Sequence, residues 1–236
     1  MASALDGNRA SRDAILARVR KALGRDASDA RAQAEAVAYL AARPHGPRPT
    51  MPADLVAGFM QRATEMASTV ERVDSLDAIP AAVARYLDTL QLPPETTGAS
   101  SRAGVCWPEF AALDWNGAGL AIEPRPTVGG DRLGISGCFC AIAETGTLVL
   151  LAAPEAPTAT VLLPDTHIAI VRAERIVSGM EEAFALIRAE RGELPRAVNM
   201  VSGPSRTGDI EQTIVLGAHG PFRMHVLVLG QGNQDC

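Results

Sequence analysis

Residues 199–211 have the sequence NMVSGPSRTGDIE, and the apolar lead-in at 197–201 predicts a buried strand that ends at a Ser-Gly-Pro turn. The hydroxyl-rich segment after the turn carries Asp209 and Glu211, which is typical of a helix start, where carboxylates face unpaired N–H groups. Arg206 would then lie at a strand-to-helix junction, where α/β folds place ligands. A well-capped connection without any ligand explains the same residues equally well.

Outward from this stretch, short apolar runs alternate with amphipathic helical patterns. Helices are expected at 53–66, 75–90 and 178–188. Strands are expected at 69–73, 105–107, 119–123, 148–153, 160–163, 167–172 and 221–229. This alternation favours an α/β fold over a helical bundle or a β-sandwich.

Composition limits the classes of function. The chain has 236 residues, of which 47% are hydrophobic, and a formal net charge of −5. That charge gives no general attraction for nucleic acid or anionic lipid. The N-terminus lacks a secretory signal pattern, and no apolar run reaches the roughly 18 residues of a membrane span. Together with cysteines that form no disulfide pattern, these features predict a soluble cytoplasmic protein.

The sequence predicts neither a metal nor a redox cofactor. It has no GxxxxGK[ST] phosphate loop and no strand-linked GxGxxG dinucleotide fingerprint. The cysteines at 106, 138, 140 and 236 do not match iron–sulfur or zinc spacings. His167, His219 and His225 could form a metal site only through tertiary proximity, because no HxxxH or HxH spacing joins them.

Glu144-Thr-Gly-Thr147 precedes an unbroken apolar run, which is an unusual place for a carboxylate. Removing an ionised Glu from water costs several kcal/mol unless N–H donors or a cation compensate. Gly146 permits a tight turn, and Thr145 and Thr147 add hydroxyls. The carboxylate could act as nucleophile, general base or ligand anchor, or it could cap the N–H groups of a neighbouring loop.

Residues 1–49 are predicted to form a helical arm with a Pro-rich linker. A helix at 13–23 places Ile15, Val19 and Leu23 on one apolar face and ends at Gly24. A second helix is expected at 29–42, before a linker that contains three prolines. The main domain is expected over 50–230, with a polar tail at 231–236. The apolar face of the arm predicts packing on a second subunit or on a partner protein.

Four motifs occur in order, and together they resemble the lactate utilization protein C family, which carries the LUD domain. They are the Glu-Thr-Gly-Thr turn at 144–147, Leu-Pro-Asp-x-His at 163–167, Gly-Pro-Ser-Arg-Thr-x-Asp-Ile-Glu at 203–211 and Gly-x-His-Gly-Pro at 217–221. The resemblance implies the three-layer α/β/α sandwich of ribose-5-phosphate isomerase, glucosamine-6-phosphate deaminase and the CoA transferases, with an N-terminal helical arm. It also implies a role in oxidising L-lactate to pyruvate, beside partner proteins that carry iron–sulfur clusters.

Two functions compete. The chain could be a component without a redox centre that binds an anionic metabolite or a partner surface. It could instead be an isomerase- or CoA-transferase-type enzyme with Glu144 as catalytic carboxylate, by analogy of fold alone. The candidate catalytic residues are Glu144 and His219. The candidate ligand-binding residues, expected to face them across one pocket, are Thr145, Gly146, Thr147, Gly203, Ser205, Arg206, Thr207 and Asp209.

Overall fold

The computed structural model of the protein describes residues 2–24, 29–90, 101–208 and 215–230. The chain divides into two compact units, Met1–Arg48 and Pro49–Cys236, one residue before the boundary expected from the sequence. The first unit is the N-terminal arm, with helices α1 (Ala2–Leu23) and α2 (Ala30–Ala42). None of the described helices combines the length and the apolar composition that a membrane crossing requires.

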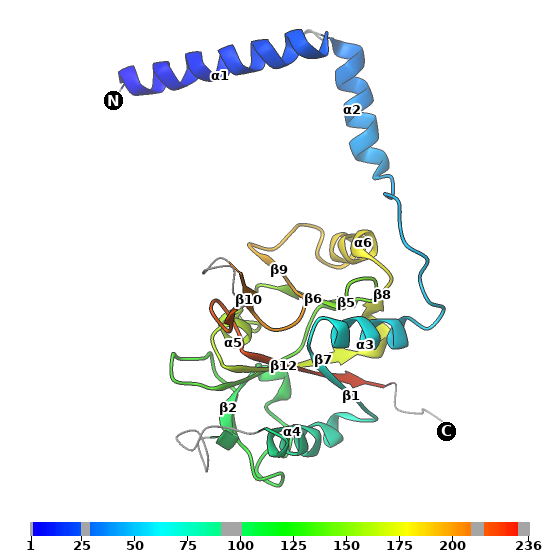
Figure 1. The fold of residues 1–236 in the computed structure, drawn as a ribbon, viewed down its shortest axis with the longest axis vertical. Coiled ribbons are helices and arrows are strands. Elements are labelled where there is room, and N and C mark those ends of the chain that lie inside the picture. Colours follow the sequence, from blue (N-terminus) through cyan, green and yellow to red (C-terminus); the bar gives the residue numbers. More distant parts are fainter. Residues whose placement is uncertain (1, 25–28, 91–100, 209–214, 231–236) are drawn as a thin grey trace. The chain divides into compact units, whose positions relative to one another are not determined.

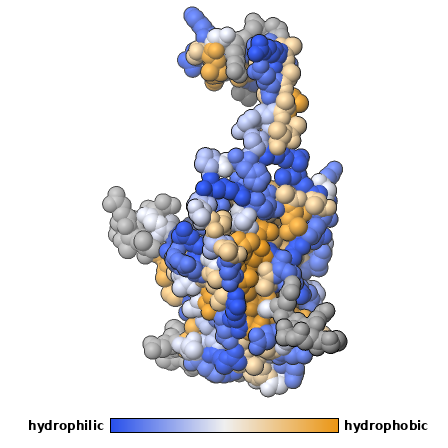
Figure 2. All heavy atoms as spheres, turned by 90° about the vertical axis from the view of Figure 1, so that its right-hand side faces the viewer, coloured by the Kyte–Doolittle hydropathy of each residue, from blue (hydrophilic) through white to orange (hydrophobic). Residues whose placement is uncertain are grey.

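The arm exposes apolar side chains on both of its helices. On α1, Ile15, Val19 and Leu23 are 51%, 48% and 64% exposed. On α2, Tyr39 and Leu40 are 66% and 72% exposed. Figure 2 shows such hydrophobic residues on the outside of the arm, between hydrophilic ones. An isolated helical arm does not bury these side chains itself.

A parallel sheet forms the centre of the second unit. In the described residues its six strands follow the order β1-β12-β7-β4-β2-β3. The strands are β1 (Thr69–Val73), β2 (Ala103–Cys106), β3 (Ala121–Glu123), β4 (Leu133–Ser136), β7 (Thr166–Arg172) and β12 (Arg223–Leu229). The two inner strands β7 and β12 are continuous buried runs, as expected for strands covered on both faces.

A smaller sheet covers one face of the main sheet. Its described strands follow the order β8-β5-β6-β9. They are β5 (Cys140–Ile142), β6 (Thr147–Leu151), β8 (Ile176–Val177) and β9 (Val198–Val201). Alternate residues of β6 face opposite sides: Leu148 and Leu150 join the core of the main sheet, whereas Val149 and Leu151 pack in a second cluster with α6 (Met180–Arg191).

Helices complete the layers. In Figure 1, α4 (Ile79–Asp88) and α6 lie on opposite outer sides of the two sheets, and α3 (Leu55–Glu65) lies beside β1 and β8. α4 buries Ile79, Val83 and Leu87, which recur at helical spacing. α3 begins at Asp54, whose carboxylate accepts the Ala57 N–H at 3.0 Å. The predicted α/β sandwich with an N-terminal helical arm is therefore confirmed, with a middle layer built from two sheets.

Two predicted elements are wrong. The apolar run 160–163 was expected as a strand, but Ala159–Leu162 form the short helix α5. The helix expected after residue 204 is also absent from the described residues there, because β10 (Arg206–Thr207) pairs antiparallel with β11 (Val215–Leu216). Arg206 therefore lies on a short strand and not at a helix start. The predicted positions Asp209 and Glu211 lie outside the described residues.

Candidate functional site

The Glu-Thr-Gly-Thr motif forms the turn of the β5–β6 hairpin. The turn covers residues 143–146, and Gly146 adopts a φ of +64°. A Cβ atom on Gly146 would lie 2.5 Å from the backbone N of Ala63, so the turn packs directly on α3. Glu144 is half-buried, and its N–H donates to the Ser178 carbonyl at 3.1 Å. Only glycine permits the close approach of the turn to α3, which explains why residue 146 is glycine.

Hydroxyl groups connect this hairpin to the loop after β9. The Thr147 Oγ1 lies 2.7 Å from the Thr145 Oγ1 and 2.6 Å from the Ser202 Oγ. Thr147 is buried, whereas Thr145 and Ser202 are exposed. The structure thus brings two motifs together that are more than fifty residues apart in the chain. The sequence analysis included Thr145 and Thr147 but missed Ser202.

The loop after β9 lies against the C-terminal end of α3. Gly203 has a φ of +80°, and a Cβ there would come within 2.0 Å of the Met66 carbonyl oxygen. The Arg206 guanidinium donates from Nη2 to the same carbonyl at 2.6 Å. A guanidinium has five N–H groups, and this bond uses one of them. Arg206 itself is exposed.

Ser205 organises the second part of the loop. Its N–H donates to the Pro221 carbonyl at 2.9 Å, and its own carbonyl accepts the Gly217 N–H at 3.0 Å. The His219 backbone N–H donates to the Ser205 hydroxyl at 3.2 Å. The structure therefore brings Ser205 and His219 together, with His219 on the surface, while Thr207 is half-buried in β10.

Glu144 lines a cavity of about 380 Å³ beside α3. Arg62 and Glu65 also line it and form an ion pair at 2.6 Å. Hydrogen bonds from Gln61 and Arg62 hold the pKa of Glu65 below its usual value. Arg206 does not line this cavity. The hairpin turn that contains Glu144 packs against α3, and Arg206 contacts Met66 at the C-terminal end of the same helix. We call Glu144, Thr145, Thr147, Ser202 and Arg206 the motif site.

The main sheet separates His167 from His225, two of the three histidines that could have formed a metal site only through tertiary proximity. His167 is fully buried, with Nε2 2.8 Å from the Ser136 Oγ, and burial lowers the pKa of its ring to about 4. His225 follows Met224, the register partner of His167, so the two rings lie on opposite faces. No group of three metal-ligating side chains occurs among the described residues.

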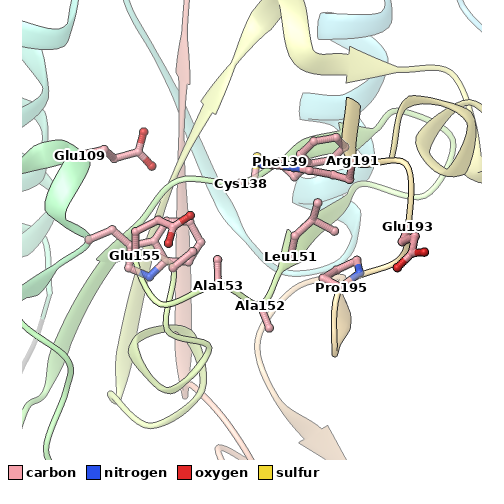
Figure 3. A pocket seen from close by; sticks show the side chains of 12 residues that line it. Glu109, Cys138, Phe139, Leu151, Ala152, Ala153, Glu155, Arg191, Glu193 and Pro195 are labelled. Carbon is pink, nitrogen blue, oxygen red and sulfur yellow. The ribbon is translucent and has the colours of Figure 1, made fainter. Parts of the chain in front are cut away.

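A second cavity, of about 490 Å³, was missed by the sequence analysis (Figure 3). Trp107 follows β2, Cys138 follows β4, and both line the cavity with Glu109. Burial raises the pKa of the Glu109 carboxyl, an effect that Arg172 opposes. The sequence pattern that could have predicted this cavity is a polar or aromatic residue shortly after each of two buried strands, Glu109 and Trp107 after β2 and Cys138 after β4.

Comparison with known proteins finds a family match for the C-terminal part of the chain. Residues 128–229 match the family model described as the LUD domain. This part of the chain is similar to the LUD domain. This match covers the Glu-Thr-Gly-Thr hairpin and the loop after β9, and it confirms the resemblance to the lactate utilization protein C family for this part of the chain.

Three curated relatives match this chain over about 100 residues. "Lactate utilization protein C" of Deinococcus radiodurans is 41% identical over 97 residues, which are 41% of this chain and 45% of that protein. The Bacillus subtilis protein of the same name is 38% identical over 95 residues, 39% of this chain and 40% of its own length. "Uncharacterized protein NMB1437" of Neisseria meningitidis is 35% identical over 96 residues, 41% of each chain. The matches thus span about two fifths of the length of these relatives.

A solved structure resembles most of this chain. It is described as a DUF162 family protein from Deinococcus radiodurans, with a TM-score of 0.54 and 25% sequence identity. The likeness covers 77% of this chain and 100% of that one. It supports the α/β fold described above.

Proposed function

We propose that this chain is a cytoplasmic component of a lactate utilization system, supporting the oxidation of L-lactate to pyruvate. In this proposal it binds a small anionic metabolite at the motif site and has no redox centre of its own. Iron–sulfur proteins of the same system would carry the electrons. The names of the relatives suggest the lactate pathway. The main observation in favour of the binding site is the hydrogen bond of 2.6 Å between Thr147 and Ser202, which joins the two motif segments.

The chemistry of the motif site suits an anion. Its hydroxyls can donate to carboxylate or phosphate oxygens, and Arg206 can bind such a group through two parallel N–H donors. Thr145, Ser202 and Arg206 of the site are exposed, so a small ligand can reach them. A guanidinium that served only the Met66 carbonyl would contribute at most about 1.5 kcal/mol to stability.

The test is growth on L-lactate by cells that lack the natural gene and carry a variant of this chain. Arg206→Ala and Arg206→Lys are both expected to impair growth, because lysine keeps the charge but loses the planar pair of donors. Titration of the purified proteins with L-lactate and with pyruvate should show weaker binding by about tenfold for Arg206→Ala.

Arg196→Lys is the matched control, because Arg196 is exposed and lies outside the motif site. The melting temperature of each variant separates binding from folding. Wild-type growth with both Arg206 variants would refute the proposal. Equal losses of growth and of folding would make Arg206 a structural residue.

The alternative is an enzyme of the CoA-transferase type with Glu144 as catalytic carboxylate. The observation in its favour is that Glu144 is half-buried and lines the cavity beside α3. Purified protein would be assayed with acyl-CoA donors and carboxylate acceptors. Acyl transfer that is lost in Glu144→Gln and retained in Glu65→Gln, a variant of the same cavity, would establish it. Absence of transfer with all donors would exclude it in favour of the binding component.

A further inference from the structure

The cavity of about 490 Å³ lies where open α/β sheets bind ligands. The chain leaves β2 for the outer strand β3 and then returns to the other side of β2 as β4, which leads on toward β7 and β12. The strand order therefore reverses between β2 and β4. Trp107 and Cys138 come directly after the carboxyl ends of these two strands and line the cavity. The cavity has the volume of a typical small-molecule site.

The walls of this cavity are apolar and include two aromatic rings. The Trp107 indole donates its Nε1–H to the Pro157 carbonyl at 3.3 Å, which fixes the orientation of the ring. The Phe139 ring lies 4.6 Å from the Arg175 guanidinium and 5.7 Å from that of Arg191. The remaining apolar walls come from Leu151, Ala152, Ala153, Ala156 and Pro195. A flat apolar group finds matching surfaces here.

The charged residues of the cavity are mainly acidic. Three carboxylates line it, from Glu109, Glu155 and Glu193, against the single guanidinium of Arg191. Figure 3 shows Glu109 and Glu155 on the side of the cavity across from Phe139 and Arg191. Two guanidinium groups lie over the Phe139 ring at the other end, so the positive charge of an organic cation is favoured at the Glu109 and Glu155 end.

Glu109 is held in this position by its contact with the chain after β4. It lies in the 3-10 helix Pro108–Phe110, directly after β2. A Cβ atom on Gly137 would come within 2.4 Å of the Glu109 Oε1, so the glycine leaves room for the carboxylate. The Arg172 Nη2 lies 3.9 Å from the Glu109 Oε2, at the limit of an ion pair. Glu109 remains exposed to solvent, and the partial burial of its carboxyl raises the carboxyl pKa.

We propose that this cavity binds a small organic cation with a flat apolar body, its ring against Trp107 and Phe139 and its ammonium group at Glu109 and Glu155. The site is independent of the motif site, which lies beside α3 and is proposed to bind an anion. Loss of one function is therefore expected to leave the other intact.

Three probes that share one phenyl ring test the proposal on the full-length protein. Phenethylamine carries a cation, 2-phenylethanol is neutral and phenylacetate carries an anion. Calorimetric titration is expected to show binding of the amine, at least about fivefold weaker binding of the alcohol, and weaker binding still of phenylacetate. Equal affinity for the three probes, tighter binding of phenylacetate, or no binding of the amine would each overturn the proposal.

Variants locate the binding. Glu109→Gln is expected to lower the affinity for phenethylamine by about fivefold and to leave that for 2-phenylethanol unchanged. Ala156→Leu places a larger side chain in the cavity and should weaken the binding of all three probes. Glu174→Gln is the matched control, because Glu174 is exposed and does not line the cavity. An unchanged amine affinity in a folded Glu109→Gln protein would contradict the assignment, and so would an equal effect of Glu174→Gln.

Discussion

At the scale of single residues, Gly146 fixes the distance between the motif hairpin and α3. Gly146→Ala is expected to destabilise the protein for two reasons: the positive φ costs about 1–2 kcal/mol, and the clash with the Ala63 backbone adds about 1–3 kcal/mol. Gly192→Ala is the matched control, because Gly192 has a φ of +72° but no atom within 4 Å of the added Cβ. Urea unfolding should show the larger loss for Gly146→Ala. Equal losses would mean that α3 yields to the methyl group.

The hydroxyl contact between Thr147 and Ser202 can be measured as a coupling energy. Thr147→Val and Ser202→Ala each remove one partner of the hydrogen bond. Because the single changes remove the same contact, the double variant is expected to lose less stability than the sum, by about 0.5–1.5 kcal/mol. Denaturation of the four proteins in the cycle provides this number. Strict additivity would show that the two loops are held together by other contacts.

At the scale of elements, strands buried on both faces were the most predictable. β7 and β12 are continuous apolar runs that only a covered parallel sheet accommodates. The run at 160–163 has the same composition but forms α5, because periodicity does not separate a short buried strand from a short helix. Its position depends on Gly134, where a Cβ would clash with the Thr160 carbonyl at 2.1 Å. That contact between distant segments is not visible in local sequence.

The motifs identified part of the site but not its geometry. Hydroxyls and carboxylates after residue 204 matched the chemistry of a helix start, yet the Ser205 backbone pairs with Pro221 and Gly217. Local capping propensity was outweighed by these tertiary hydrogen bonds. Glu109 was missed because its neighbour Gly137 follows β4 while Glu109 follows β2, and only the strand order places the two residues together.

The buried histidines of β7 and β12 make stability depend on pH. Burial lowers the pKa of His167 and of His225 to about 4 from 6.5, although Glu71 and a hydrogen bond to the Thr69 backbone oppose this for His225. The unfolded chain therefore binds more protons below pH 6.5. The contribution of the two neutral rings to stability is present in full above that pH. It falls as the pH drops toward 4, and the free energy of unfolding is lower by about 2 kcal/mol for each ring at about pH 5.

His225→Phe tests this dependence on pH. The His225 ring stacks on Tyr86 with centroids 4.0 Å apart, and phenylalanine keeps a ring there without a titrating group. The difference in unfolding free energy between about pH 7.5 and about pH 5 is expected to shrink by about 2 kcal/mol. His219→Phe, at an exposed ring, is the control and should leave the difference unchanged. A full difference in His225→Phe would show that other groups cause the acid sensitivity.

At the scale of the whole molecule, the arm and the main unit carry opposite charge. Residues 1–48 contain nine Arg and Lys against five Asp and Glu, whereas the remainder contains 13 against 22. The arm is therefore expected to pack on the acidic unit of a second copy or on another protein of the lactate system. Deletion of residues 1–48 should leave the main unit folded but abolish this association, as measured by light scattering after gel filtration and by co-purification.

Two point variants separate the apolar face of the arm from its charge. Val19→Glu places a carboxylate on the face with Ile15 and Leu23, and Ala17→Glu places the same charge elsewhere on the helix. Only Val19→Glu should break the association, while added salt should weaken it in the wild-type and Ala17→Glu proteins. Unchanged assembly after deletion of the arm would refute this role.

The position of β12 also has a consequence for synthesis on the ribosome. β12 is the last strand of the main sheet in the sequence, yet it lies between β1 and β7. β1 pairs only with β12 in the described sheet, and Thr69 meets His225 across 156 residues. The first strand to leave the ribosome must therefore wait for the last one. During that interval β1 lacks its partner in the described sheet, and the sheet is completed only after β12 has left the ribosome.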